Sequence, residues 1–145
     1  AGYLESQLQA FKSGQRKDPT MTAMAAPLSE EDMADLAVWY AGQKQAPGSA
    51  DPALADAGGE MYRGGNAASG VSACQACHTP NGNGNPAAGF PAISGQHAAY
   101  VEKALKDYRS GDRGASEKGK MMRGVAAEMT DAEIAAVAQY VQGLQ

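Results

Sequence analysis

The sequence predicts an all-α protein, and three observations support this fold class. Apolar residues recur at helical spacing, as in residues 3–12, and glycines stand where such stretches end. Two further stretches begin with Ser or Thr followed by acidic residues, a pattern typical of capped helix starts. No segment alternates apolar and polar residues as a half-buried strand does.

The first predicted helix covers residues 3–12 and ends before Gly14, and residues 15–28 are expected to be irregular. Asp51-Pro52 resembles a helix cap with proline at the first helical position. The later helices are expected at residues 29–42, 52–64, 99–110 and 130–141. Between them, residues 43–52 have a linker's composition, and residues 64–96 form a long Gly/Asn/Pro-rich stretch. A stretch of that length is unusual in a small domain unless something other than side chains organises it.

The chain contains an internal repeat. Tyr3 and Gly14 recur 97 positions later as Tyr100 and Gly111. After an insertion of four residues the offset becomes 101. Ser29 then falls on Thr130, and the apolar stripe that follows Ser29 falls on the one that follows Thr130. We interpret this as two copies of one supersecondary unit, with chance similarity of two alanine-rich helices as the alternative. Residues 51–97 precede only the second copy, so their equivalent is expected to be missing ahead of the first.

Composition narrows the class of protein. The chain has 145 residues, a net charge of −4 and only 6% aromatic residues, so a cofactor is expected to fill part of a thin core. No apolar run approaches the ~18 residues of a membrane span. The acidic balance argues against a surface for nucleic acid or anionic membranes.

Residues 74–78 read Cys-Gln-Ala-Cys-His, which is the attachment signature of c-type haem. Thiols three residues apart lie on one turn and can add to the two porphyrin vinyl groups, while the adjacent His78 binds the iron. Three alternatives remain. A thioredoxin-like redox pair expects a βαβ context, and a plain disulfide can join Cys74 and Cys77. A zinc site would need both histidines, His78 and His97, besides the two cysteines.

A haem iron bound by one histidine needs a sixth ligand unless its site is open, and methionine is a usual choice. Met129 stands directly before a helix cap and is interpreted as a hydrophobic staple. At the repeat offset of 101, Met122 falls on Met21, whereas Met121 falls on Thr20. A position that is methionine in both copies is the better ligand, so Met122 is favoured and Met121 stays an alternative.

The second ring nitrogen of His78 needs an acceptor that fixes its tautomer. A carbonyl from residues 86–95 is expected to supply it, and Pro91 is favoured because its backbone is rigid. His97 lies 19 residues beyond His78 and is interpreted as a surface or rim histidine rather than a ligand.

These motifs carry a family resemblance. The run from Tyr62-Arg63-Gly64-Gly65 through CQACHTPNGNGN to GFPAISGQHAAY and MMRGVAAEMTDAEI resembles the second domain of di-haem cytochrome c4. YLESQLQAFKSG and MTAMAAPLSEEDMADLAVWYAGQ resemble the later part of that family's first domain. The resemblance implies class I cytochrome c folds, with a partial first domain at residues 1–46 that lacks the haem motif and a complete domain at residues 47–145.

The resemblance also assigns roles. Cys74 and Cys77 are expected to be thioether sites, His78 and Met122 axial ligands, and the Pro91 carbonyl the group that orients the histidine. Met21 matches the axial methionine of the first haem, so a second haem is expected if the missing front segment exists.

The resemblance further implies one-electron transfer in the bacterial periplasm. The partners that it implies are redox proteins, namely a cytochrome bc-type donor and a haem-copper terminal oxidase as acceptor; peripheral membrane association stays open. An acidic surface suggests a partner with a basic patch. Two rivals remain: an enzyme such as a peroxidase, which needs an open iron and nearby acid–base groups, and a subunit fixed to a larger dehydrogenase through an apolar face.

Overall fold

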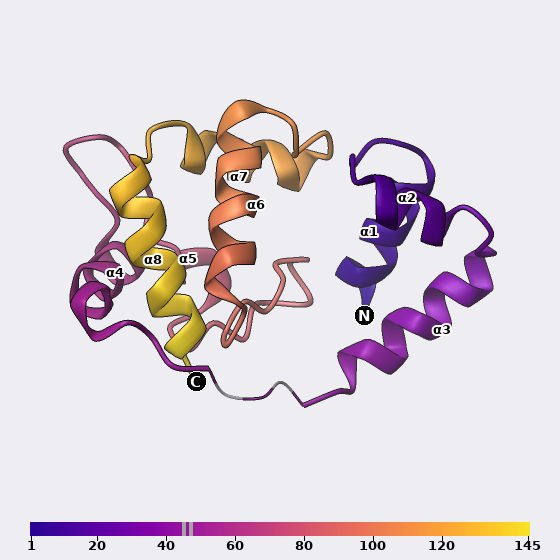
Figure 1. Ribbon diagram of the computed structural model, residues 1–145, viewed down its shortest axis with the longest axis horizontal. Helices are drawn as coiled ribbons and strands as arrows, with labels where there is room; N and C mark the ends of the chain where they lie inside the picture. Colours follow the sequence, from indigo (N-terminus) through magenta and orange to yellow (C-terminus); the bar gives the residue numbers. More distant parts are fainter. Residues whose placement is uncertain (45, 47) are drawn as a thin grey trace. The chain divides into compact units, whose positions relative to one another are not determined.

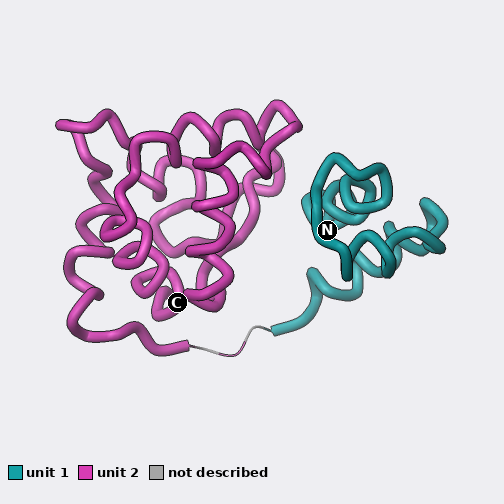
Figure 2. Tube along the Cα trace, turned by 45° about the horizontal axis from the view of Figure 1, so that its top comes forward, with its two compact units in different colours: residues 1–44 teal, residues 45–145 magenta. Residues whose placement is uncertain are grey.

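The computed structural model describes residues 1–44, 46 and 48–145, and the chain divides into two compact units (Figures 1 and 2). Unit 1 comprises residues 1–44 and unit 2 residues 45–145. The domain boundary predicted between residues 46 and 47 involves Pro47, which lies outside the described residues. None of the described helices has the length and apolar character that a membrane span requires.

Unit 1 is built from three helices, of which α1 packs against both others. A complete capping box begins the third helix: the Ser29 hydroxyl accepts from Asp32 N, and the Asp32 carboxylate accepts from Ser29 N. Phe11, Met33 and Ala37 are buried between the helices. The helices are α1 (Gly2–Lys12), α2 (Pro19–Ala25) and α3 (Glu30–Ala41).

Unit 2 surrounds its core with four longer helices and one short one (Figure 1). The last helix, α8, packs against both α4 and α6, and α7 packs on α6. The buried cluster includes Met61, Tyr62, Leu105, Ile134 and Val137. The helices are α4 (Pro52–Gly64), α5 (Gln75–His78), α6 (Ala98–Ser110), α7 (Glu117–Ala127) and α8 (Asp131–Gly143).

The all-α prediction is confirmed. Across the described parts of the chain, pairing of extended backbone is limited to two isolated bridges, Asn66 with Val71 and Asn85 with Phe90. Both bridges close turns in the Gly/Asn/Pro-rich stretch between α4 and α6, on either side of α5. The predicted helix starts at Ser29, Pro52 and Thr130 agree with the structure within one residue.

The prediction that residues 15–28 are irregular is wrong, because they contain helix α2. Asp18 caps this helix by accepting a hydrogen bond from Met21 N, and Pro19 occupies its first position. The corresponding region of the second copy contains α7. Both methionines matched by the repeat, Met21 and Met122, therefore lie on helices rather than in loops.

The repeat is also visible in side-chain interactions. The Arg16 guanidinium lies 4.4 Å from the centre of the Phe11 ring, and 97 residues later Arg113 lies 4.7 Å from that of Tyr108. Likewise, Lys12 Nζ donates to the Leu28 carbonyl at 2.5 Å. Its counterpart Arg109 donates to the Met129 carbonyl at 2.8 Å. Such matched tertiary contacts favour duplication over chance similarity of two helices.

Candidate haem site

The short helix α5 places the two cysteines one turn apart. Cys74 is its N-cap, and the Cys74 carbonyl accepts from the backbone N–H groups of Cys77, at 3.3 Å, and of His78, at 3.0 Å. Both thiols are free and half-buried. Burial raises the pKa of the Cys74 thiol to about 11, so this thiol is uncharged at neutral pH.

His78 is buried at the end of α5, with 8% of its surface exposed. Its Nδ1–H donates a hydrogen bond to the Pro91 carbonyl at 2.8 Å. Burial lowers the pKa of the imidazole, and the bond to Pro91 opposes that shift. The ring is therefore held neutral with Nδ1 occupied, and this leaves Nε2 as the nitrogen available to a metal.

Tight turns deliver the Pro91 carbonyl to His78. Asn85 and Phe90 exchange two backbone hydrogen bonds of 2.9 Å each, which closes the turn before Pro91. Gly84 has φ +73°, and a Cβ there would lie 2.5 Å from the Pro91 carbonyl carbon. Only glycine fits this close approach, so the sequence GNGN after the motif supports the orientation of His78.

The structure separates the candidate methionines. Met122 is half-buried and packs against the core of unit 2, whereas Met121, its neighbour on α7, is 52% exposed. Met129 is buried in the core beside the start of α8, as expected for a hydrophobic staple. Met21 is half-buried on α2 in unit 1, and His97 is exposed at the N-cap of α6.

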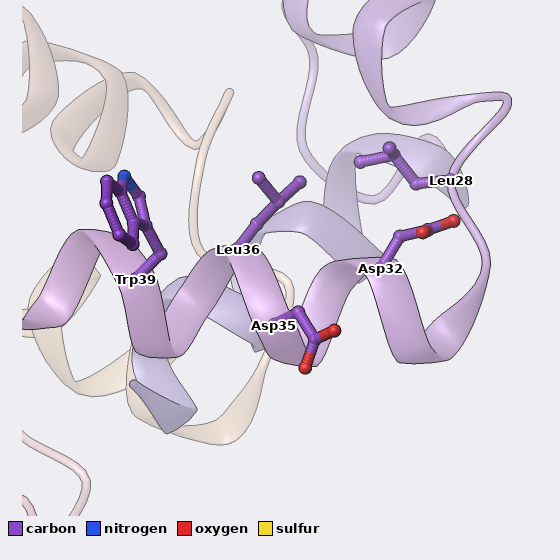
Figure 3. A pocket seen from close by; sticks show the side chains of 5 residues that line it. All are labelled: Leu28, Asp32, Asp35, Leu36 and Trp39. Carbon is purple, nitrogen blue, oxygen red and sulfur yellow. The ribbon is translucent and has the colours of Figure 1, made fainter.

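These residues fit haem c. Two unpaired thiols stand on one turn, the adjacent imidazole has one nitrogen free, and a thioether packs on the same core. Over the described ranges, no group of three or more His, Cys, Asp or Glu side chains is placed to hold a metal ion, as the zinc alternative would need. An open groove occurs elsewhere, on α3 of unit 1 (Figure 3), where it is lined by Leu28, Asp32, Asp35, Leu36 and Trp39.

Comparisons with known proteins agree with this geometry. The family model for cytochrome c matches residues 63–145. Cytochrome c4 of Stutzerimonas stutzeri is 46% identical over 151 residues, an alignment that covers 98% of this chain and 72% of that protein. The chain belongs to the cytochrome c4 family. Its class I cytochrome c fold is shown by a crystal structure of reduced recombinant cytochrome c4 from Pseudomonas stutzeri. The two match with a TM-score of 0.94 and 45% identity over 99% of this chain and 80% of that one.

Membership of the cytochrome c4 family makes this chain an electron carrier with haem c attached through Cys74 and Cys77. A thiosulfate dehydrogenase electron acceptor from Thiomonas intermedia is also similar. It is 38% identical, and the alignment covers 96% of this chain and 64% of that protein. The cytochrome c4 relatives come from bacteria.

The Tyr62 hydroxyl, which contacts the residue directly after the motif, was not singled out from the sequence. It donates a hydrogen bond to the carbonyl of Thr79, the residue after His78, at 2.7 Å. The two residues lie 17 positions apart, and no local periodicity links them. The sequence signal was only that an aromatic residue stands near the end of the helix that precedes the motif.

Proposed function

We propose that this cytochrome c4-family chain transfers single electrons through a haem c whose axial ligands are His78 and Met122. The observation that carries the proposal is the buried His78 ring, whose Nδ1 is fixed on the Pro91 carbonyl while a thioether packs against the same core. When bound, a haem with His and Met ligands supplies a one-electron couple with a raised potential.

The chain's own residues orient this group. Cys74 and Cys77, on the turn of α5, would hold the haem covalently, and the Pro91 carbonyl sets the tautomer and direction of the His78 ring. Because the Pro91 carbonyl accepts the hydrogen bond from Nδ1–H, the imidazole becomes a stronger electron donor to a metal through Nε2. The soft thioether of Met122 opposes this effect by favouring the reduced iron.

The same geometry argues against an enzyme with an open site. Such an enzyme needs acid–base groups beside a vacant iron position, and the second histidine of the chain, His97, is exposed at the start of α6. A subunit fixed permanently to a larger dehydrogenase needs a wide apolar face. Among the described residues of unit 2, which holds the haem motif, the large apolar side chains that stay exposed are Tyr100 and Met121; the others lie in unit 1, at Met24, Val38, Trp39 and Tyr40. For unit 2 we therefore propose a carrier that docks briefly and is not itself an enzyme.

Carbon monoxide tests the proposed ligands. We expect the reduced native protein to keep its visible spectrum under carbon monoxide, because Met122 fills the sixth position. Met122→Ala is expected to bind carbon monoxide and to lower the reduction potential. Met121→Ala, a matched change on the exposed side of the same helix, should leave both properties at the native values. If Met121→Ala opened the iron and Met122→Ala did not, the ligand assignment would be wrong.

We further propose a periplasmic location, a cytochrome bc-type donor and a haem-copper terminal oxidase as acceptor. The similarity to cytochrome c4 of several bacteria supports this role. The similarity to a thiosulfate dehydrogenase electron acceptor supports a second donor, a thiosulfate-oxidising enzyme. The rate at which each donor reduces this protein, measured by stopped flow, distinguishes the two donors. The net charge of −4 predicts that rates with a partner bearing a basic patch fall as salt is added.

We also propose that residues 1–46 are the later part of a first cytochrome c domain and residues 47–145 a complete one. The groove on α3 supports this (Figure 3). At the offset of 101, Trp39 corresponds to Tyr140, which α4 covers in unit 2, yet Trp39 is 66% exposed. We infer that a helix equivalent to α4 fills the groove in a complete first domain.

Met21 would then be the axial methionine of a second haem. Haem quantitation on the native protein tests this: two covalent haems per molecule are expected. One haem per molecule would mean that Met21 only packs within unit 1.

A further inference from the structure

Thr79, which follows the proposed iron ligand His78, has an unusual backbone conformation. Its φ is +70° and its ψ is 159°, and among the described residues it is the one non-glycine residue with positive φ. A β-branched residue rarely adopts this conformation, and it persists only where surrounding contacts impose it. The contacts that impose it here therefore also fix the peptide that joins Thr79 to His78.

Local hydrogen bonds hold the nitrogen, the side chain and the carbonyl of Thr79, the last through Gly82 N, which donates to it at 3.1 Å. The Thr79 N–H donates to the Gln75 carbonyl at 3.0 Å, and its hydroxyl donates to Asn81 Oδ1 at 2.8 Å. The same hydroxyl accepts from Asn83 N at 3.1 Å. All of these partners lie within four residues of Thr79. One of them, Gln75 on α5, is itself tied to α4, because its Nε2 donates to the Arg63 carbonyl at 2.7 Å.

The long-range anchor is Tyr62. Its hydroxyl donates to the Thr79 carbonyl at 2.7 Å from helix α4, and the residue is fully buried. Burial raises the pKa of the phenol, so it remains a hydrogen-bond donor throughout the neutral range. If the bond is broken, the buried Tyr62 hydroxyl loses its partner, while the half-buried Thr79 carbonyl keeps its bond from Gly82 N. The bond from Tyr62 therefore ties the strained peptide to the helical core.

We propose that the Tyr62 hydroxyl is a positioning group for the haem ligand, which holds Thr79 in its strained conformation and so fixes the orientation of His78. The proposal rests on His78 being the axial ligand. The neighbouring contacts show how the effect is transmitted: the His78 carbonyl accepts from Gly84 N at 2.9 Å, and its ring donates to Pro91. If Thr79 relaxed to negative φ, the His78 carbonyl would turn and the bond from Nδ1 to Pro91 would lengthen.

Reduction potential is the readout that separates positioning from general stabilisation. A weaker bond from Nδ1 to Pro91 makes the imidazole less basic, and a less basic ligand stabilises ferric iron less. We therefore expect Tyr62→Phe to raise the midpoint potential of the holoprotein. The proposal is overturned if Tyr62→Phe keeps the native potential, even if its unfolding temperature falls.

Tyr140 offers a matched control. Its ring centre lies 5.3 Å from that of Tyr62, and its hydroxyl accepts from Arg63 Nη1 at 3.0 Å. Tyr140→Phe thus removes a phenol hydroxyl from the same aromatic pair without removing the bond to Thr79. We expect its potential to equal the native value. An equal rise in both variants would contradict a specific role for Tyr62.

A second variant tests the strain directly. Glycine adopts φ near +70° without cost, so Thr79→Gly removes the need for the Tyr62 anchor. The double variant Tyr62→Phe/Thr79→Gly is expected to return the potential towards the native value. If Tyr62→Phe alone yields no holoprotein, the double variant is expected to recover it. A double variant that stays shifted, or that yields no holoprotein, contradicts the proposal. Failure of the proposed function would show separately, as carbon monoxide binding by the native reduced protein.

Discussion

Gly58 lies where α4 crosses α8, and Gly58→Ala tests whether that crossing closes the unit that holds the haem motif. A Cβ at residue 58 would lie 2.1 Å from the Ala136 carbonyl oxygen and 2.7 Å from Tyr140 Cβ. Ordinary contacts begin at 3.4 Å. The closest obstacle is a backbone oxygen within α8, which cannot rotate away as a side chain can. The helices must therefore separate by more than an ångström.

Two opposing terms set the expected size of the effect. Replacing glycine by alanine within a helix stabilises it by roughly 0.5–1 kcal/mol. Overpacking a close contact costs about 1–3 kcal/mol, and a rigid backbone obstacle places this site at the upper end. The net loss is about 2 kcal/mol. For a domain of about 100 residues, this lowers the unfolding temperature by roughly 8–16 °C.

Thermal unfolding of the holoprotein, followed by circular dichroism, measures this loss. Gly64→Ala is the matched control, because Gly64 ends the same helix and a Cβ there meets nothing within 4 Å. We expect that variant to unfold at or slightly above the native temperature. If Gly58→Ala unfolded at the same temperature as Gly64→Ala, the α4–α8 crossing would not be as close as described.

Two further predictions concern the turns and caps around the site. Lys118 Nζ lies 4.8 Å from the centre of the Phe90 ring and donates to the Ala88 carbonyl, so Lys118→Met should cost about 1–2 kcal/mol of unfolding free energy. Lys120→Met, which removes only an exposed ion pair with Glu117, should cost less than about 0.5 kcal/mol. Denaturant titration of both variants measures the two losses, and equal losses would contradict the role of Lys118. The Glu133 carboxylate accepts a hydrogen bond from Thr130 N and another from Asn66 Nδ2. These bonds, the first more than the second, lower the pKa of the carboxyl below the ordinary 4.5. Because the pKa of Glu133 is lower in the folded state, its ionised carboxylate stabilises the fold above pH 4.5. This contribution is lost as the pH falls through the folded-state pKa, so the difference in unfolding free energy between the native protein and Glu133→Gln should narrow under acid. A gap for Glu133→Gln that stayed constant with pH would contradict the assignment.

Much of the fold could be predicted because its signals are local. Ser29 and Thr130 mark helix starts by the cap and acidic residues that follow each, and the structure contains both capping boxes. Helix α7 was not predicted although Ser116 caps it, by accepting from Gly119 N, and Glu117 follows; glycines interrupt the helix, and the acidic residue of a capping box is missing three positions after the cap. Its tertiary packing is on α6, and at its start Gly119 approaches Gly114 so closely that a Cβ would be 2.5 Å from the Gly114 Cα.

The candidate site was predictable where chemistry fixes spacing. The two thiols and His78 must share one turn, so the motif itself locates them. The internal repeat distinguished Met122 from Met121, and the structure shows that the first packs inward while the second is exposed. The bond from Tyr62 to Thr79 joins residues of different elements, and the strain at Thr79 has no sequence pattern. That part required the three-dimensional structure.

The central claim is that this chain holds haem c covalently at residues 74–78. The most direct test is the intact mass, under denaturing conditions, of the 145-residue chain produced in cells that attach haem to such motifs. The polypeptide alone has a mass of 14.9 kDa. We predict a measured mass equal to that of the polypeptide plus one haem. The added mass should be lost when Cys74 and Cys77 are both replaced by alanine. A denatured mass equal to the bare polypeptide, with haem separating in acid, would contradict the account.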